Sequence, residues 1–436
     1  MIGDYNSTKD LWIRLKSESR TVLLYGIGNG ADKIFDTCSN YGIEILGVFA
    51  SDGFVTKSGG RRRCFRGMTI MSYSEAKEKF AHRDYVILLC FASRIPEVID
   101  NICRISEERE LLVPDVPVCP DSELFTSEFC RKNTDKIDKA RKLFSDSESL
   151  RIFDGIIEAR LTGSLSALLE SSSSDEYNGE NFLSFETYRT YVDLGAYNGD
   201  TVYELLGKAA ALQKIYAVEP DKKTFKRLSS FCSGLGLKLD GINIKPKICV
   251  PPDGYTDIWA QPGTFGSLSV CADKCDNKCG DKCGNGRVCE ILLYNAAAWN
   301  MNGNLAFFSN GNRGSGSFRR ENCGYKNSDT ICTITLDSIL DGQGADYIKY
   351  DVEGAEREAL EGSSKTICDF MPDICLSLYH RSEDIFEQEH STCRPQVRDS
   401  LPRKSCHFPL NTWQLQGRFH NASSSLCAGS LVPGLR

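Results

Sequence analysis

The stretch that decides the fold runs from residue 191 to residue 201 and reads YVDLGAYNGDT. Residues 191–194 form an apolar strand run, and a turn bounded by Gly195 and Gly199 follows. Glycines at such a turn let the backbone bend tightly and approach a ligand without a Cβ clash. Residues 201–211 then show the pattern of a helix, so the stretch predicts a strand, a glycine turn and a helix in succession.

An acidic residue ends the next strand run, residues 214–219, and a helix is expected at 222–232. Glu219 stands 24 residues after Gly195. At that position a carboxylate can accept hydrogen bonds from both hydroxyls of a ribose. The spacing therefore indicates an adenosine ligand, which dinucleotide and S-adenosylmethionine sites share.

Three details of the turn favour the sulfonium cofactor. The glycines do not follow the G-x-G-x-x-G pattern of a dinucleotide site. Asp193 precedes the first glycine and Asp200 opens the helix. These two anions would repel a pyrophosphate but tolerate a cationic amino-acid group. The alternative is a plain strand-to-helix turn in which Asp200 caps the helix.

Further strand runs extend the pattern in both directions. Alternating strands and helices predict an α/β fold with a doubly wound, mostly parallel sheet. After Glu219 the candidate strands are residues 291–295, 305–309, 331–335, 347–351 and 374–378. Before it, strands at 21–26, 43–49 and 85–90 predict a separate parallel unit over residues 20–112. Charged helices at 136–144 and 150–161 are expected to link the two units.

Composition limits the class of protein. The chain has 436 residues and a formal net charge of −7, which argues against nucleic acid or an anionic membrane as the main partner. No apolar run approaches the ~18 to 20 residues of a membrane helix, and the first 20 residues do not resemble a signal peptide. A cytoplasmic protein is therefore expected, and most of its 20 cysteines are expected to be buried, reduced thiols.

Ordered sequence blocks resemble the FkbM-type methyltransferases over residues 191–387. The blocks are DLGAYNGDT (193–201), AVEPDKKTFKRL (217–228), NAAAW (295–299), GSGSF (314–318), TLDSIL (335–340), YIKYDVEGAEREALEG (347–362) and LSLYHRSEDIFE (376–387). The resemblance implies a Rossmann-like methyltransferase fold that uses S-adenosyl-L-methionine. It also implies methyl transfer to a hydroxyl of a sugar, a glycan or a related natural product.

The resemblance also assigns residues to the cofactor. Asp193, Gly195 and Gly199 would surround its methionine part, and Tyr197 and Asn198 of the same turn are also expected to bind the cofactor. Glu219 would hold the ribose, and Asn295 and Ala296 would lie beside the adenine.

Two side chains are candidates for a general base, which a hydroxyl acceptor with a high pKa requires. Asp351 is expected at the end of a strand that faces the same cleft, and His380 follows another strand run. A structural role for His380 is the alternative, since lone histidines are often structural. For Glu356, at the start of a helix, stabilisation of the helix N-terminus is the favoured role.

The first unit carries its own glycine turn, from Gly26 to Gly30, with Asp52 after the following strand. It resembles Rossmann-like domains that bind nucleotides or sugar nucleotides, although a structural partner domain is as plausible. The expected fold is thus two Rossmann-like units joined by a helical linker. The domain boundaries are 1–115, 116–180 and 181–387, followed by an atypical tail at 388–436 that is expected to be disordered.

A cysteine cluster marks an insertion at residues 243–290. Five thiols follow one another as Cys271, Cys275, Cys279, Cys283 and Cys289. A flexible loop is favoured here, and no metal site is assigned, because zinc ligands more often occur as C-x2-C pairs. Metal binding and disulfide formation are the alternatives.

The tail raises a functional alternative as well. Past residue 387 the sequence departs from the expected continuation of the family, so a catalytically weak nucleotide- or sugar-binding scaffold is the second hypothesis. An oxidoreductase that uses the first glycine turn is a third hypothesis and is disfavoured.

Overall fold

The computed structural model divides the chain into two compact units. The first combines the residues before Leu183 with those from Ser377 onward, and the second comprises Leu183–Gly311 and Ser315–Leu376. The structure describes residues 9–52, 55, 57–58, 61–93, 95–119, 121–144, 146–171, 183–235, 242–249, 287–309, 316–318 and 329–387. An α/β fold with two parallel-strand sheets is confirmed.

The sheet of the first unit has six strands in the order β5-β6-β2-β1-β7-β8, and only β5 runs antiparallel to its neighbour. The strands are β1 (Thr21–Tyr25), β2 (Ile45–Ala50), β5 (Cys64–Phe65), β6 (Met68–Ser72), β7 (Tyr85–Leu89) and β8 (Leu111–Leu112). Two short strands, β3 (Lys57–Ser58) and β4 (Arg61–Arg62), form a separate antiparallel pair.

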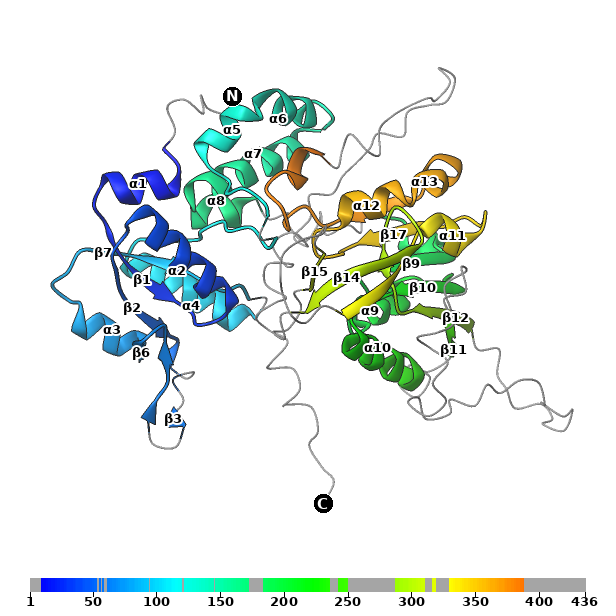
Figure 1. Cartoon of the computed structure of the whole chain (residues 1–436), viewed down its shortest axis with the longest axis horizontal. Coiled ribbons are helices and arrows are strands. Elements are labelled where there is room, and N and C mark those ends of the chain that lie inside the picture. Colours follow the sequence, from blue (N-terminus) through cyan, green and yellow to red (C-terminus); the bar gives the residue numbers. More distant parts are fainter. Residues whose placement is uncertain are drawn as a thin grey trace, which may run out of the picture. The chain divides into compact units, whose positions relative to one another are not determined.

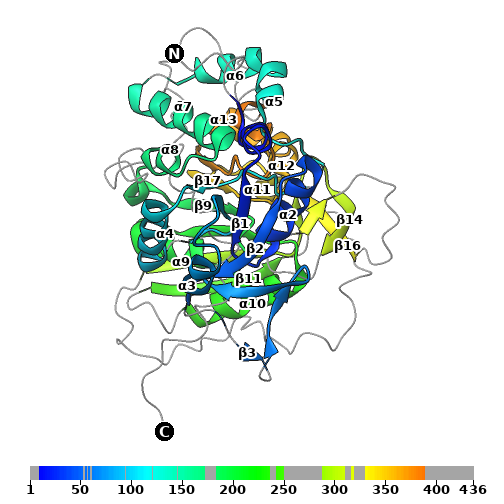
Figure 2. The ribbon, with the colours of Figure 1, turned by 90° about the vertical axis from the view of Figure 1, so that its left-hand side faces the viewer.

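Helices cover both faces of this sheet (Figure 2). Because side chains alternate along a strand, Val22 and Leu24 of β1 enter one core and Leu23 and Tyr25 enter the other. The first core includes residues of α1 (Leu11–Ser17) and α2 (Asn29–Tyr41). The second includes residues of α3 (Tyr73–Lys79) and α4 (Pro96–Glu108).

Four further helices of the described first unit gather in one group in both ribbon views (Figures 1 and 2). They are α5 (Ser127–Lys132), α6 (Thr134–Arg141), α7 (Ser147–Thr162) and α8 (Leu165–Glu170). The segment 377–387 packs into this group: Phe386 stacks on Phe129 with ring centroids 5.9 Å apart, and Ser382 donates through Oγ to the carbonyl of Glu123 at 2.6 Å.

The second unit contains a fully parallel sheet in the order β11-β12-β10-β9-β17-β18 (Figure 1). Its strands are β9 (Thr190–Leu194), β10 (Lys214–Val218), β11 (Ile242–Cys249), β12 (Arg287–Tyr294), β17 (Tyr347–Tyr350) and β18 (Asp373–Leu376). Thus β11 and β12 occupy both ends of the segment 243–290 that the sequence marked as an insertion, and residues 250–286 between them lie outside the described residues.

Two amphipathic helices of the second unit share one core with this sheet. Val202 and Leu205 of α9 (Asp200–Lys208) and Phe225 and Leu228 of α10 (Lys222–Gly234) belong to the same core cluster as Ile215 of β10. The described residues of this unit also form the 3-10 turn Phe185–Thr187 and the helices α11 (Leu336–Leu340), α12 (Glu356–Glu361) and α13 (Ser364–Phe370).

A second, smaller sheet corrects one expectation. The strands predicted at 305–309 and 331–335 do not join the parallel sheet. They lie in β14 (Gly303–Ser309) and β16 (Asp329–Ile334), which pair antiparallel in a four-stranded sheet with β13 (Ala297–Ala298) and β15 (Gly316–Phe318). Antiparallel neighbours need no crossover helix, and none is described between β14 and β16.

For the described residues, no helix combines the length and the apolar character that crossing a bilayer requires.

A buried ion pair should stabilise the first unit. Arg160 and Asp115 approach to 2.9 Å with side chains 6% and 1% exposed, and Arg160 also lies over the ring of Phe125. Arg160→Met leaves the Asp115 carboxylate buried without its cation, so we expect a loss of about 3–5 kcal/mol in the free energy of unfolding. Urea denaturation followed by circular dichroism measures this loss. Glu128→Gln, which removes an exposed pair with Lys132, is the control and should change little.

Candidate functional site

Four central strands of the second unit end at the same level of the sheet. Leu194 pairs with Val218 and with Tyr350, and Val218 pairs with Tyr294. Backbone hydrogen bonds continue this register beyond the strand ends: Gly195 and Ala196 donate to the carbonyl of Val218, Glu219 to Tyr294 and Asp351 to Leu194. The residues after β9, β10, β12 and β17 therefore lie along one carboxyl edge, where ligands bind in open parallel sheets.

The turn after β9 needs its glycines. Gly195 has φ +86°, and a Cβ built on it would lie 1.9 Å from the carbonyl oxygen of Asp351. Gly199 has φ +89°, and its Cβ would lie 2.8 Å from the Phe231 ring. Between them Tyr197 adopts φ +47°, while Asn198 is exposed and accepts through Oδ1 from the amide of Asp200 at 3.2 Å. The turn is thus held close to β17 and α10.

Glu219 is buried directly after β10. Its two carboxylate oxygens accept from the backbone amides of Tyr197 at 3.0 Å and Asp221 at 2.9 Å. Burial nevertheless raises the pKa of Glu219 to about 8, against these two hydrogen bonds. A carboxylate has about four lone-pair sites. After the two amide bonds each oxygen therefore retains one site for a further donor.

Asn295 and Ala296, which directly follow β12, are both buried. The Asn295 amide donates to the carbonyls of Glu219 at 2.7 Å and Pro220 at 3.0 Å. This side chain therefore fixes the backbone that carries the acid. Its contact with an adenine, and that of Ala296, stay predictions.

A lysine that the sequence analysis did not select lies between two of the predicted residues. The Lys349 Nζ is 3.4 Å from Asp193 Oδ1 and 3.5 Å from Asp351 Oδ2. The side chains of Lys349 and Asp193 are 7% and 0% exposed, whereas that of Asp351 is 25% exposed. A lysine inside an otherwise apolar strand, YIKY, was the signal that could have identified it.

Opposing effects act on the pKa values of this group. Burial raises the pKa of Asp193, and the positive charge of Lys349 opposes that rise. Burial lowers the pKa of Lys349, but the two carboxylates outweigh it and raise the pKa above its ordinary value. The lysine therefore stays protonated. When both carboxylates are ionised, the three side chains carry one net negative charge.

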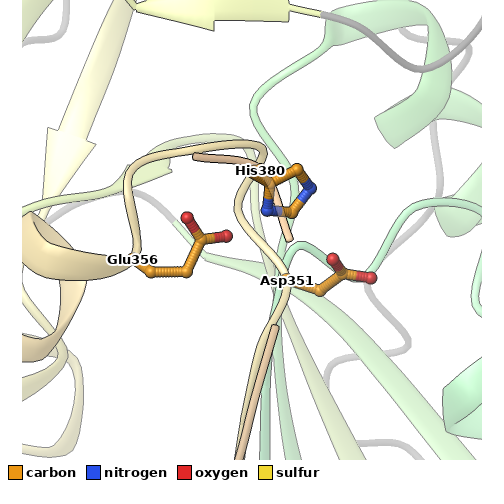
Figure 3. Close-up of side chains that lie close together, drawn as sticks. All are labelled: Asp351, Glu356 and His380. Atoms are coloured by element: carbon orange, nitrogen blue, oxygen red, sulfur yellow. The ribbon is translucent and has the colours of Figure 1, made fainter. Parts of the chain in front are cut away.

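The acids that follow β17 take different positions (Figure 3). Asp351 ends the strand, whereas Glu356 begins α12, is fully buried and accepts through Oε1 from the amide of Val352 at 3.0 Å. Glu356 thus closes the loop between β17 and α12. Its stabilisation of the helix N-terminus stays a prediction.

His380, also drawn in Figure 3, belongs to the first unit and is described with it. Its backbone carbonyl accepts from the amides of Val118 at 3.0 Å and Cys119 at 3.1 Å, and its ring centroid lies 4.1 Å from that of Tyr379. The neighbouring Arg381 pairs with Asp121 at 3.1 Å. These contacts anchor the segment around His380, and its catalytic role stays a prediction.

In the glycine turn of the first unit, Gly30 is required for close packing. A Cβ on Gly30 would lie 2.4 Å from the carbonyl oxygen of Cys90, so this glycine lets α2 approach the end of β7. Asp52, considered as a ribose acid, accepts at both carboxylate oxygens from Ser74, from its amide at 3.1 Å and its hydroxyl at 2.6 Å. Nucleotide binding by this unit stays a prediction.

Of the cysteine cluster, Cys271, Cys275, Cys279 and Cys283 lie outside the described residues, as does the tail at 388–436. Cys289 is described: it lies in β12 and is fully buried in the core of the second unit.

Comparisons with known proteins support the resemblance. Residues 193–399 match the family model of the Methyltransferase FkbM domain, so the match continues past residue 387. No curated protein matches the chain. The crystal structure of Methyltransferase FkbM from Methylobacillus flagellatus KT is similar, with a TM-score of 0.53, 16% sequence identity and coverage of 88% of each chain. At this identity the two proteins share a fold.

The close approach at Gly195 gives a stability prediction. Gly195→Ala forces a side chain into a left-handed conformation and against the Asp351 carbonyl, so we expect the second unit to lose more than about 2 kcal/mol of unfolding free energy. Thermal and urea unfolding measure the change. Gly207→Ala is the control, because nothing lies within 4 Å of a Cβ there. In its helix the alanine should stabilise by about 0.5–1 kcal/mol. Equal effects at both positions would contradict the packing argument.

Proposed function

We propose that this protein is an S-adenosylmethionine-dependent methyltransferase that modifies a hydroxyl group of a sugar, a glycan or a related natural product. The observation that carries the proposal is the buried Glu219 beside the Gly195–Gly199 turn, at an edge where four parallel strands end together. The match of residues 193–399 to the Methyltransferase FkbM domain supports the same activity and does not favour the scaffold hypothesis.

The charges at this edge suit the proposed cofactor. Asp193 and Asp351 outnumber the single cation Lys349, so a pyrophosphate would meet an excess of negative charge. S-adenosylmethionine instead carries a sulfonium and an ammonium group beside one carboxylate. In a buried environment the sign of the local charge discriminates strongly between such ligands. The electrostatics therefore favour the sulfonium cofactor over a dinucleotide.

The hydrogen-bonding groups fit the same ligand. Each oxygen of Glu219 retains a lone-pair site beyond its amide bond, which matches the two hydroxyls of one ribose. Gly195 and Gly199 have no Cβ, so they adopt the left-handed backbone of the turn without steric cost. Asp193 would meet the ammonium group of the methionine part.

The main contribution of the protein to methyl transfer would be to position the cofactor and the acceptor hydroxyl. The bound cofactor supplies a methyl group on a sulfonium, which is activated for in-line displacement. Glu219 and the glycine turn would fix the donor, which converts the reaction into an effectively intramolecular one. Asp351, the most accessible of the three charged side chains, would accept the proton of the acceptor hydroxyl as the new carbon–oxygen bond forms.

Calorimetric titration of the full chain tests the proposal. We expect S-adenosylmethionine to bind, NAD to give no heat, and Glu219→Gln to weaken cofactor binding at least tenfold, because a neutral amide replaces the carboxylate that accepts both ribose hydroxyls. Glu204→Gln on the exposed side of α9 is the matched control and should bind like the unmodified protein. Binding of NAD without S-adenosylmethionine would exclude the methyltransferase.

The pKa of Glu219 predicts how cofactor binding depends on pH. Since burial raises this pKa from its ordinary 4.5 to about 8, the carboxyl is mostly protonated at pH 6.5 in the free protein. Ribose hydroxyls bind the ionised form best, so affinity should rise up to about tenfold per pH unit and level off above about pH 8. Titrations with S-adenosylhomocysteine from pH 6 to 9 measure this rise. An equal rise in Glu219→Gln would refute the assignment.

The raised pKa of Glu219 has the opposite effect on the stability of the folded protein: stability decreases with rising pH, whereas cofactor affinity increases. The folded state holds the proton of Glu219 more tightly than the unfolded chain does. The contribution of this group to the unfolding free energy is therefore complete below about pH 4.5 and is lost as the pH rises through about 8. Ligand-free protein should accordingly lose this contribution over the pH range in which cofactor affinity increases.

A further inference from the structure

We propose that Lys349 is a positioning residue of the cofactor site, whose ammonium group bridges Asp193 and Asp351 and fixes the two carboxylates relative to each other. The inference rests on the proposed function. In this inference one buried lysine fixes the distance between Asp193, which would meet the methionine part, and Asp351, which would face the acceptor hydroxyl.

The strand pattern creates this arrangement. Lys349 of β17 is the direct Cα partner of Asp193 in β9, so their side chains leave the same face of the sheet. Asp351 follows Lys349 by two residues and returns to that face. The next partners in the row are small, Ala217 on one side and Cys375 on the other. The lysine side chain can therefore lie along the sheet between the two acids.

The surroundings make a purely structural lysine costly. The same core contains the apolar side chains of Tyr191, Ile215, Ala217 and Tyr347. In such a core a charge is expensive unless it is paired, and apolar residues of similar volume often stabilise a fold at least as well. Here Lys349 and Asp193 are buried as a charged pair. The ammonium group of Lys349 also lies beside Asp351, whose side chain is partly exposed. The arrangement fits a function at the strand edge better than a requirement of the fold.

The bridge also determines the protonation of Asp193. The titratable and charged groups around the pair come from several elements: Tyr191 of β9, Asp200 of α9, Cys232 of α10, Tyr347 and Asp351 of β17 and its end, and Cys375 of β18. Lys349 is the only cation among these groups. Without it, burial would raise the pKa of Asp193 with no cation to oppose the rise, which favours the protonated acid. A cofactor ammonium would then have to displace that proton.

Calorimetry at pH 7 in two buffers of different ionisation enthalpy measures both affinity and proton release. For Lys349→Met we expect at least tenfold weaker binding of S-adenosylmethionine and a larger proton release per cofactor than in the unmodified protein. Lys349→Arg keeps the charge and should restore most of the affinity without the extra proton release. Lys226→Met, an exposed lysine on α10, is the matched control. Circular dichroism establishes that each variant is folded.

The outcomes separate the two proposals. If the unmodified protein does not bind S-adenosylmethionine, the proposed function fails and this inference with it. If it binds and Lys349→Met matches it in affinity and proton release, only the positioning role is overturned. Equal losses in folded Lys349→Arg and Lys349→Met, without extra proton release, would also overturn it. Should Lys349→Met not fold, the smaller and polar Lys349→Gln replaces it, with the same extra proton release expected.

Discussion

The rest of the site depends on one constraint, the common end point of strands β9, β10, β12 and β17. Backbone hydrogen bonds from Gly195, Glu219 and Asp351 to the neighbouring strand enforce it one residue beyond each strand end. Because the strands are parallel, residues far apart in the chain meet at one edge without long loops. The glycine at position 195 is a consequence of the same constraint, since only a residue without Cβ fits against the Asp351 carbonyl.

Much of this arrangement could be predicted from the sequence, because each part has a local signal. Apolar runs marked the strands, and Gly195 and Glu219 marked the ends of two of them. Parallel order then required those ends to lie together. Local sequence patterns could not show which strands are neighbours in the sheet. The pairing of β17 with β9 places Lys349 opposite Asp193, and no spacing along the chain encodes that register.

The same reason explains the other differences between sequence and structure. The strands at 303–309 and 329–334 carry ordinary strand patterns, but their antiparallel partner is set by tertiary pairing. Asn295 was predicted to lie beside the adenine, and the structure adds that its amide donates to the carbonyl of Glu219. Asp52 follows a strand as a ribose acid would, and the structure adds that both of its carboxylate oxygens accept from Ser74. These contacts join segments that are distant in the sequence, and residue type alone does not reveal them.

The return of segment 377–387 to the first unit has a consequence for biosynthesis. The ring of Phe386 and the backbone at Ser382 pack on helices and loops that precede residue 133. The sheet of the second unit is complete in the nascent chain once Leu376 has emerged from the ribosome. The first unit begins earlier in the sequence but acquires the packing of segment 377–387 later. The order of completion during translation is thus the reverse of the order of the two units in the gene.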